Sequence, residues 1–331
     1  MRVMVTGAAG FIGKALTLEL IERLSREDEL VFCDFELPDA EVEAAFGASG
    51  SPKQIYLGGV YPVLDTKNPY SQIEWVFQNA HHGLHPIDIV FHLAVGSHVG
   101  GSMRDALLDL ELSVALFEVA QRSGVRRFVH ASSGAVFGDG RGLHSPHHDR
   151  DRYHSKSPYA WSKMAFECWV KGVNTPDIVD MQFRSLRMSN VFGPGDSRGL
   201  PYLLSQMGRR AEGSLRELEL RVPYSSARDY IHVDVAAREF ARHLEDIAVL
   251  GSGESIGQLF YNVCSGASTS IHEVLSMAED VFGGSIRYTD APGECPDDEV
   301  YQTHMRRSPW MEAESLEAHT LRAYFEAEAG R

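Results

Sequence analysis

Tyr159 and Lys163 are the residues of this sequence best suited to acid–base chemistry. They stand four residues apart in Tyr159-Ala160-Trp161-Ser162-Lys163, so on a helix they would share one face. A phenol with a pKa of about 10 is a poor base near neutral pH. A nearby ammonium favours the phenolate and lowers that pKa. The pair predicts proton transfer at a substrate hydroxyl, although Tyr and Lys also pair by chance on many helices.

Ser132 and Ser133 form a second polar group. They directly follow Arg127-Phe128-Val129-His130-Ala131, a segment typical of a buried strand. A hydroxyl at the carboxyl end of a strand can hydrogen-bond a substrate oxygen, or it can cap a turn. The residues alone leave both roles open.

A glycine-rich turn near the amino terminus is the third feature. The apolar run Val3-Met4-Val5 leads into Thr6-Gly7-Ala8-Ala9-Gly10-Phe11-Ile12-Gly13, and a helical pattern follows over residues 14–24. Strand, glycine turn and helix in this order are typical of a dinucleotide-binding loop. A tight turn with no ligand is the alternative.

Each glycine of this turn would have its own role. Gly7 permits the sharp turn, Gly10 lets backbone N–H groups approach a pyrophosphate, and Gly13 allows helix and strand to pack closely. The N–H groups of the first helical turn, around Phe11 and Ile12, then face the phosphates. We therefore expect these five residues to contact the cofactor.

Asp34 indicates which dinucleotide binds. The apolar strand Leu30-Val31-Phe32-Cys33 ends at Asp34, 21 residues after Gly13. A carboxylate there can accept hydrogen bonds from the adenosine ribose hydroxyls and repels a 2′-phosphate. The pattern favours NAD over NADP, and a solvated acid without this role is the alternative.

Bulk composition argues against several classes of partner. The 331 residues carry a formal net charge of -15, which is unfavourable for binding nucleic acid or an anionic membrane. The 4 cysteines lack C-x-x-C spacing, and neither a secretory signal nor a membrane-spanning run is evident. We expect a cytoplasmic protein. The pairs His81-His82 and His147-His148 lack the i, i+4 spacing of a helical metal site, so no metal is expected.

The elements that must position these residues alternate between strand and helix. Beyond the first two strands, further strands are expected at residues 54–57, 87–94, 127–131 and 182–187, and helices at 14–24, 107–121 and 162–171. Such alternation predicts an α/β fold: a Rossmann-like, doubly wound parallel sheet that binds ligands at the carboxyl ends of its strands.

The pattern loosens after Val191, which indicates a smaller lobe built from non-contiguous pieces. We assign residues 1–187 and 227–264 to an NAD-binding Rossmann domain. Residues 188–226 and 265–331 are assigned to a carboxyl-terminal substrate-binding lobe, with a helix expected over 312–328.

Together these segments resemble the extended short-chain dehydrogenase/reductase family, in its NAD-dependent epimerase/dehydratase group. The resemblance covers nearly the whole chain. Besides the glycine loop and the Tyr–Lys pair, the similar segments are His92-Leu93-Ala94, Ser132-Ser133-Gly134-Ala135-Val136-Phe137-Gly138, Asn190-Val191-Phe192-Gly193-Pro194-Gly195, Arg228-Asp229-Tyr230-Ile231-His232-Val233-Asp234 and Tyr261-Asn262-Val263-Cys264-Ser265-Gly266.

The resemblance implies roles for the matching residues. Ser133, Tyr159 and Lys163 match the catalytic residues of the family, and Tyr159 and Lys163 also contact its cofactor, NAD. Leu93 and Ala94 match the segment that packs along the NAD. The family works as dimers, which implies a homodimer formed by the helices at 107–121 and 162–171.

Substrate recognition is implied by two further positions. Asn190 matches a residue that helps to hold the substrate, and Arg228 one that meets the diphosphate of a nucleotide sugar, unless it pairs with a nearby acid. Three positions depart from the family pattern. Gly58 stands where an acid is frequent, Asp109 where Asn is usual, and residues 291–294 lack a second arginine for the diphosphate.

Gly134 and Ala135 bear on the type of reaction. Related dehydratases and decarboxylases often carry Asp or Glu directly after the catalytic Ser or Thr, whereas these two residues carry no proton. The sequence therefore favours an NAD-dependent nucleotide-sugar epimerase, an isomerase of carbohydrate metabolism that acts at C4 by transient oxidation and hydride return. A ketoreductase, or a dehydratase or decarboxylase using another acid, remains open. A non-catalytic dinucleotide-sensing protein is the alternative of another class.

Overall fold

The computed structural model describes residues 1–48, 50–58, 74, 77, 86–96, 101–138, 151–154, 157–173, 181–210, 216–220, 226–245, 259–290, 305–307, 311 and 316–331. The chain forms two compact units. The first unit comprises Met1–Val136, Ser155–Arg187 and Ala237–Tyr261, and the second comprises Phe137–His154, Met188–Ala236 and Asn262–Arg331. The functions assigned above to a cofactor domain and a substrate lobe stay predictions.

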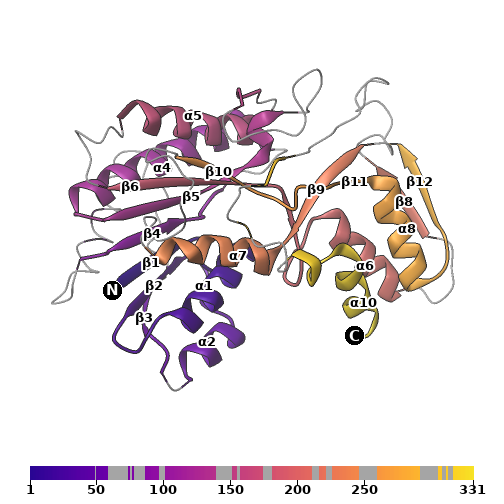
Figure 1. Ribbon diagram of the computed structural model, residues 1–331, viewed down its shortest axis with the longest axis horizontal. Helices are drawn as coiled ribbons and strands as arrows, with labels where there is room; N and C mark the ends of the chain where they lie inside the picture. Colours follow the sequence, from indigo (N-terminus) through magenta and orange to yellow (C-terminus); the bar gives the residue numbers. More distant parts are fainter. Residues whose placement is uncertain are drawn as a thin grey trace. The chain divides into compact units, whose positions relative to one another are not determined.

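A seven-stranded sheet, in the order β10-β6-β5-β4-β1-β2-β3, organises the first unit (Figure 1). Adjacent strands from β3 through β2, β1 and β4 to β5 pair in parallel, which confirms the predicted α/β class. The strands are β1 (Arg2–Thr6), β2 (Glu29–Asp34), β3 (Lys53–Gly58), β4 (Ile89–His92), β5 (Arg127–Ser133), β6 (Gln182–Met188) and β10 (Phe260–Val263).

Helices cover both faces of this sheet. Helices α4 and α5 pack against each other on one face, and α1 lies on the other (Figure 1). The helices are α1 (Phe11–Arg23), α2 (Ala40–Phe46), α4 (Met103–Arg122), α5 (Pro158–Val173) and α7 (Val233–Ala241), with short 3₁₀ turns η1 (Gly134–Phe137) and η2 (Arg242–Leu244). This arrangement brings the carboxyl ends of the parallel strands to one edge, where ligands bind in such folds.

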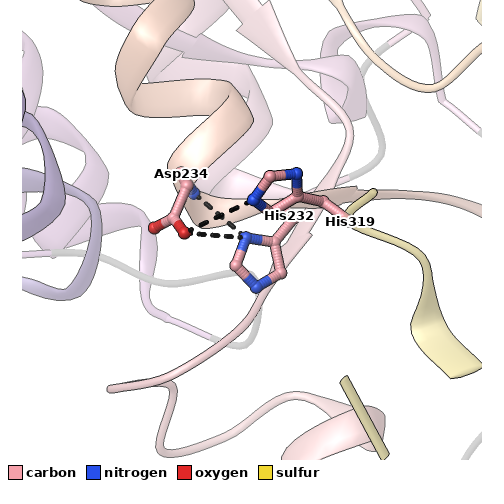
Figure 2. A group of neighbouring side chains, drawn as sticks. All are labelled: His232, Asp234 and His319. Carbon is pink, nitrogen blue, oxygen red and sulfur yellow. Dashed lines mark hydrogen bonds and ion pairs between the residues drawn. The ribbon is translucent and has the colours of Figure 1, made fainter. Parts of the chain in front are cut away.

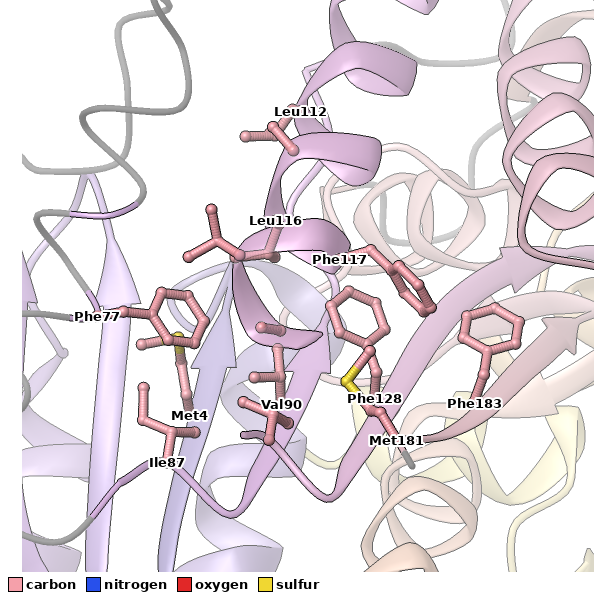
Figure 3. Packing of buried hydrophobic residues seen from close by; sticks show 14 of the residues in the cluster. Met4, Phe77, Ile87, Val90, Leu112, Leu116, Phe117, Phe128, Met181 and Phe183 are labelled. Carbon is pink, nitrogen blue, oxygen red and sulfur yellow. The ribbon is translucent and has the colours of Figure 1, made fainter. Parts of the chain in front are cut away.

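The central strands are largely apolar, and both of their faces are covered by helices. All five residues of β1 and all four of β4 are buried, as expected for parallel strands between two helical layers. Figure 3 shows how Phe117 of α4 packs against Phe128 of β5 and Phe183 of β6. These ring contacts hold α4 on the sheet, and α4 packs against α5, the helix that carries Tyr159 and Lys163.

Local capping explains where the structure departs from the expected helix bounds. Helix α4 begins at Met103, ahead of the predicted residue 107, because Ser102 and Asp105 form a capping box. Of the helix expected over 312–328, residues 312–315 lie outside the described residues, residues 316–317 are helical, and residues 318–320 interrupt it. Helix α10 begins at Leu321, where Thr320 accepts a hydrogen bond from the backbone of Ala323.

The second unit contains a three-stranded sheet, β11-β9-β7, and a two-stranded one, β12-β8. Its helices α6, α8 and α10 pack around a core that includes Phe192 and Phe325. The elements are β7 (Asn190–Phe192), α6 (Leu200–Arg210), β8 (Arg216–Leu220), β9 (Ala227–His232), β11 (Ser268–Ser270), α8 (Ile271–Phe282), β12 (Ile286–Asp290) and α10 (Leu321–Ala329). Within the described part of the chain, no helix is long and apolar enough to cross a membrane.

Candidate active site

The glycine loop joins β1 to α1, and two of its glycines have no room for a side chain. Gly7 has a φ of +72°, and a Cβ on it would lie 2.7 Å from the nitrogen of Ala94. A Cβ on Gly13 would lie 1.9 Å from the carbonyl oxygen of Gly7. The close approach of loop, strand and helix therefore requires glycine at both positions.

The start of α1 fits a bound pyrophosphate. Its N-cap is Gly10, and no side chain caps the helix, so Phe11 and Ile12 open the helix without a side-chain acceptor for its first N–H groups. A helix start of this kind favours an anion through its N–H groups and the helix dipole. The loop is thus suited to the dinucleotide predicted from the sequence.

Asp34 is held directly against this loop. One carboxylate oxygen accepts a hydrogen bond from the Ala9 nitrogen at 2.8 Å, and the other accepts one from the Glu36 nitrogen at 3.2 Å. Both bonds orient the carboxylate at the end of β2, next to the strand that carries the loop. This is the position from which a carboxylate can meet the ribose hydroxyls.

Leu93 and Ala94 follow β4 and pack on the same loop. The Leu93 nitrogen donates to the Thr6 carbonyl at 3.1 Å, and the Ala94 nitrogen donates to the Thr6 hydroxyl at 3.4 Å. The backbone of Leu93 and Ala94 therefore lies directly against Thr6 and Gly7. A segment that lies along a cofactor bound at the loop would need this position.

Ser133, Tyr159 and Lys163 come together at the carboxyl end of β5. Ser133 is the last residue of β5, and Tyr159 lies in the first turn of α5 with Lys163 one turn later. The Ser133 hydroxyl lies close enough to the Tyr159 phenol to favour its ionised form and so to lower its pKa. The Lys163 ammonium lies 5.9 Å from the centre of the Tyr159 ring. The structure thus places the three predicted catalytic side chains in one site.

Burial controls the titration of this site. Burial raises the pKa of Tyr159, an effect that the Ser133 hydrogen bond opposes and the charge of Asp109 adds to. This differs from the expected lowering by a nearby ammonium, because the cost of burying a phenolate dominates. Burial also lowers the pKa of Lys163 to about 8, against the opposing charges of Asp109 and Glu167.

His130 is a member of this site that sequence analysis treated only as part of a core strand. It is fully buried on β5, with its Nε2 atom 3.5 Å from the Lys163 Nζ atom. Its Nδ1 atom lies 3.1 Å from the hydroxyl of Ser185, which itself donates to Glu167 at 2.8 Å. The Ser185 hydroxyl must therefore accept from Nδ1–H, which leaves the Nε2 lone pair to accept from the ammonium.

The acids around Lys163 are also held in place. Glu167 forms a fully buried ion pair with Arg187, with a shortest N···O distance of 2.7 Å. Asp109, the residue found where Asn is usual, accepts a hydrogen bond from the Gly96 nitrogen at 2.7 Å. One sequence signal could have pointed to His130: it is a histidine within a buried strand that leads directly to Ser133.

Asn190 and Arg228 belong to the second unit. They lie on neighbouring strands, β7 and β9, and Asn190 donates to the Asp229 carbonyl at 3.1 Å. The Arg228 guanidinium donates to the carbonyl of Ala227 at 3.0 Å. Both residues stay predicted substrate ligands.

The paired histidines considered above as metal ligands, His81-His82 and His147-His148, lie outside the described residues. Residues 291–294, which lack the family's second arginine for the diphosphate, also lie outside the described residues. The structure instead brings together His232, Asp234 and His319, which do not adjoin in sequence.

Comparison with known protein families shows to which family the chain belongs. The profile of the NAD dependent epimerase/dehydratase family matches residues 74–264, more than half of the chain. The chain belongs to this family. Its members use NAD, and the chain carries the glycine loop and the Ser–Tyr–Lys site described above, so the predicted affiliation and cofactor are confirmed.

Similar proteins agree with this affiliation over most of the chain. The chain is 28% identical over 323 residues to UDP-glucose 4-epimerase 3 of Oryza sativa subsp. japonica, covering 90% of this chain and 81% of that protein. UDP-glucose 4-epimerase of Thermotoga maritima, solved with UDP-glucose, has the same fold, with a TM-score of 0.73, 20% identity, and coverage of 100% and 98%. MoeE5, solved with UDP-glucuronic acid and NAD, matches at 25% identity with a TM-score of 0.71 and the same coverage.

Proposed function

We propose that this protein is an NAD-dependent nucleotide-sugar epimerase that acts at C4 of the sugar. The observation that carries the proposal is the single site formed by Ser133, Tyr159 and Lys163 at the carboxyl end of β5, in the same unit as the glycine loop. Membership of the NAD-dependent family and the resemblance to sugar-nucleotide epimerases support it.

Bound NAD would accept a hydride from the sugar carbon and return it, and Gly7, Gly10, Phe11, Ile12, Gly13 and Asp34 would hold it. Leu93 and Ala94 would lie along it. In this proposal Tyr159 takes the proton of the substrate hydroxyl, and Ser133 hydrogen-bonds the same oxygen. Lys163 contributes positive charge beside the phenol, and its ammonium is oriented by the lone pair of His130.

Substrate binding is assigned to the second unit. Asn190 and Arg228 are proposed to hold the sugar and the diphosphate respectively, since a guanidinium is well suited to pair with phosphate oxygens. This assignment rests on the motif resemblance and on the positions of both residues on paired strands.

The test is conversion of nucleotide sugars by the purified protein supplied with NAD. With UDP-glucose or UDP-galactose deuterated at C4, we expect the epimeric product to retain the deuterium without net release of NADH. Loss of the label to water would instead indicate proton abstraction at carbon. Stoichiometric consumption of added NADH with a ketosugar would indicate the reductase.

Two variants test the assignment of the catalytic residues. Tyr159→Phe removes only the phenol oxygen, so turnover should fall by roughly 10²–10⁴-fold while NAD binding survives. Ser133→Ala should cost less, because it removes one hydrogen bond and not the proton acceptor. Full activity of Tyr159→Phe would refute the assignment. NAD binding without turnover of any nucleotide sugar would favour the sensing protein.

We also propose a homodimer formed through α4 and α5. These helices pack together, and Leu107 on α4 is 51% exposed, as expected for a side chain that a partner would cover. Light scattering at micromolar concentration should report twice the mass of the chain, and a monomer would contradict the proposal. Among the described residues, Cys33, Cys168 and Cys264 form no disulfide bond, in keeping with the expected cytoplasmic location, which stays a prediction.

A further inference from the structure

Three side chains of the second unit, all of types that can bind a metal ion, lie close together where β9 leads into α7. The Asp234 Oδ2 atom lies 3.5 Å from His232 Nδ1 and 3.8 Å from His319 Nε2 (Figure 2). All three ligand atoms lie within 4.8 Å of one another. His232 ends β9, and Asp234 is the second residue of α7. His319 comes just before α10, so the tertiary structure brings it to the other two.

The spacing of these atoms is close to that of a metal site. Zinc binds imidazole nitrogen and carboxylate oxygen at about 2.0–2.1 Å, which puts tetrahedral ligand atoms about 3.3 Å apart. The two distances to the Asp234 oxygen exceed that value by only a few tenths of an ångström. Small side-chain rotations, chiefly of His319, would bring the two imidazole nitrogens to the same spacing.

The His232 ring is in the tautomer that metal binding through Nδ1 requires. The Asp234 backbone N–H donates to His232 Nδ1 at 3.3 Å, so Nδ1 carries the lone pair that a metal needs. This hydrogen bond is long and therefore weak. An ion can replace a bond this weak, and the Asp234 side chain is exposed although its neighbours Val233 and Val235 are buried.

One side of the site is buried, and the other faces solvent. The His232 ring is buried edge-on against Phe192, with ring centres 5.3 Å apart, and Gly193 leaves room for it, since a Cβ there would lie 3.0 Å from His232 Nε2. The Asp234 side chain is 55% exposed and that of His319 is 26% exposed. An ion can therefore enter from solvent and keep a water ligand in the remaining position.

We propose that His232, Asp234 and His319 form a binding site for a divalent transition-metal ion of the zinc type. Two imidazoles and one carboxylate suit Zn²⁺ and not Mg²⁺, which prefers oxygen ligands alone. The ion would tie the segment before α10 to the end of β9, the strand that also carries Arg228. Because these segments are far apart in sequence, the unfolded chain does not hold the three ligands together, so the ion binds the folded state and stabilises the second unit.

The experiment is titration of the full-length, tag-free and chelator-treated protein with Zn²⁺ alone, followed by isothermal calorimetry. We expect one Zn²⁺ per chain, at least tenfold weaker binding in His319→Ala and in Asp234→Asn, and no comparable binding of Mg²⁺. His272→Ala is the matched control, because it removes an exposed histidine of α8 in the same unit and should bind like the parent.

A second readout reports on coordination directly. Co²⁺ in place of Zn²⁺ should give visible ligand-field absorption in the parent and in His272→Ala, and lose it in His319→Ala. Asp234→Asn keeps the test valid if His319→Ala misfolds, since Asp234 is exposed and the exchange is nearly isosteric. Binding below one ion per chain, or equal Zn²⁺ affinity in parent, His319→Ala and Asp234→Asn, would overturn the proposal. The three side chains would then form only a hydrogen-bonded ion-pair cluster.

Discussion

Replacing Lys163 with methionine should remove a pH-dependent cost of folding from the nucleotide-free protein while it removes the ammonium of the catalytic site. The lysine is 4% exposed, and burial lowers its pKa from 10.5 to about 8. A folded state that binds this proton less tightly than the unfolded chain is destabilised wherever the unfolded lysine is charged. Methionine has a similar length and no charge to bury.

The pKa difference sets the size of the effect. One pKa unit corresponds to about 1.4 kcal/mol, so the charged lysine costs about 3 kcal/mol of folding free energy at pH 7. Between pH 8 and 10.5 the unfolded chain binds more protons than the folded one, so the parent becomes more stable as the pH rises. At pH 9.5 the remaining cost is about 1.4 kcal/mol.

A second contribution has the opposite sign but does not depend on pH. Without the ammonium, the buried Nε2 lone pair of His130 loses its partner, at a cost of about 1–3 kcal/mol. Burial holds the pKa of His130 well below its usual value, so the imidazole is neutral at both pH values. The change of the Lys163→Met effect with pH therefore isolates the cost of burying the charge.

The assay is urea unfolding of parent and Lys163→Met at pH 7 and pH 9.5, after removal of nucleotide. The stability of the variant relative to the parent should fall by about 2 kcal/mol between the two pH values. Lys171→Met, an exposed change on the same helix, is the control and should show no such dependence. A relative stability that is constant, or that rises with pH, would refute the reasoning.

Three further substitutions test other parts of the structure. Asp34→Ala should weaken NAD binding and reduce its advantage over NADP, because it removes the carboxylate that the loop orients; titration of both cofactors measures this, and an unchanged ratio would contradict it. Gly13→Ala should abolish NAD binding, since its methyl would lie 1.9 Å from a loop carbonyl, whereas Gly172→Ala, with nothing within 4 Å, should bind normally in the same fluorescence titration. Equal affinities of the two glycine variants would show that the loop can relax. Glu167→Gln leaves the Arg187 charge buried without its carboxylate and should lower the free energy of unfolding by about 3 kcal/mol; a loss under about 1 kcal/mol in urea unfolding would mean that the pair contributes little.

The fold could be predicted because its signals are local. Buried parallel strands read as continuous apolar runs, and alternation with helical segments indicates the parallel sheet. The starts of two helices differ from the predicted ones for an equally local reason. The capping box of Ser102 and Asp105 lengthens α4, and the cap at Thr320 delays α10, because a few hydrogen bonds decide where a helix begins.

The sequence by itself determined which side chains come together through their spacing along the chain. Tyr159 and Lys163 share a helix face through their spacing, and the glycine loop needs only a strand and a helix in succession. Tertiary structure decided which groups from other elements meet them. It buried Lys163 against His130 and raised the pKa of Tyr159 where local reasoning predicted a lower one. It also placed His319 beside Asp234. Desolvation and contacts between distant segments depend on how elements pack, and no pattern of neighbouring residues encodes that packing directly.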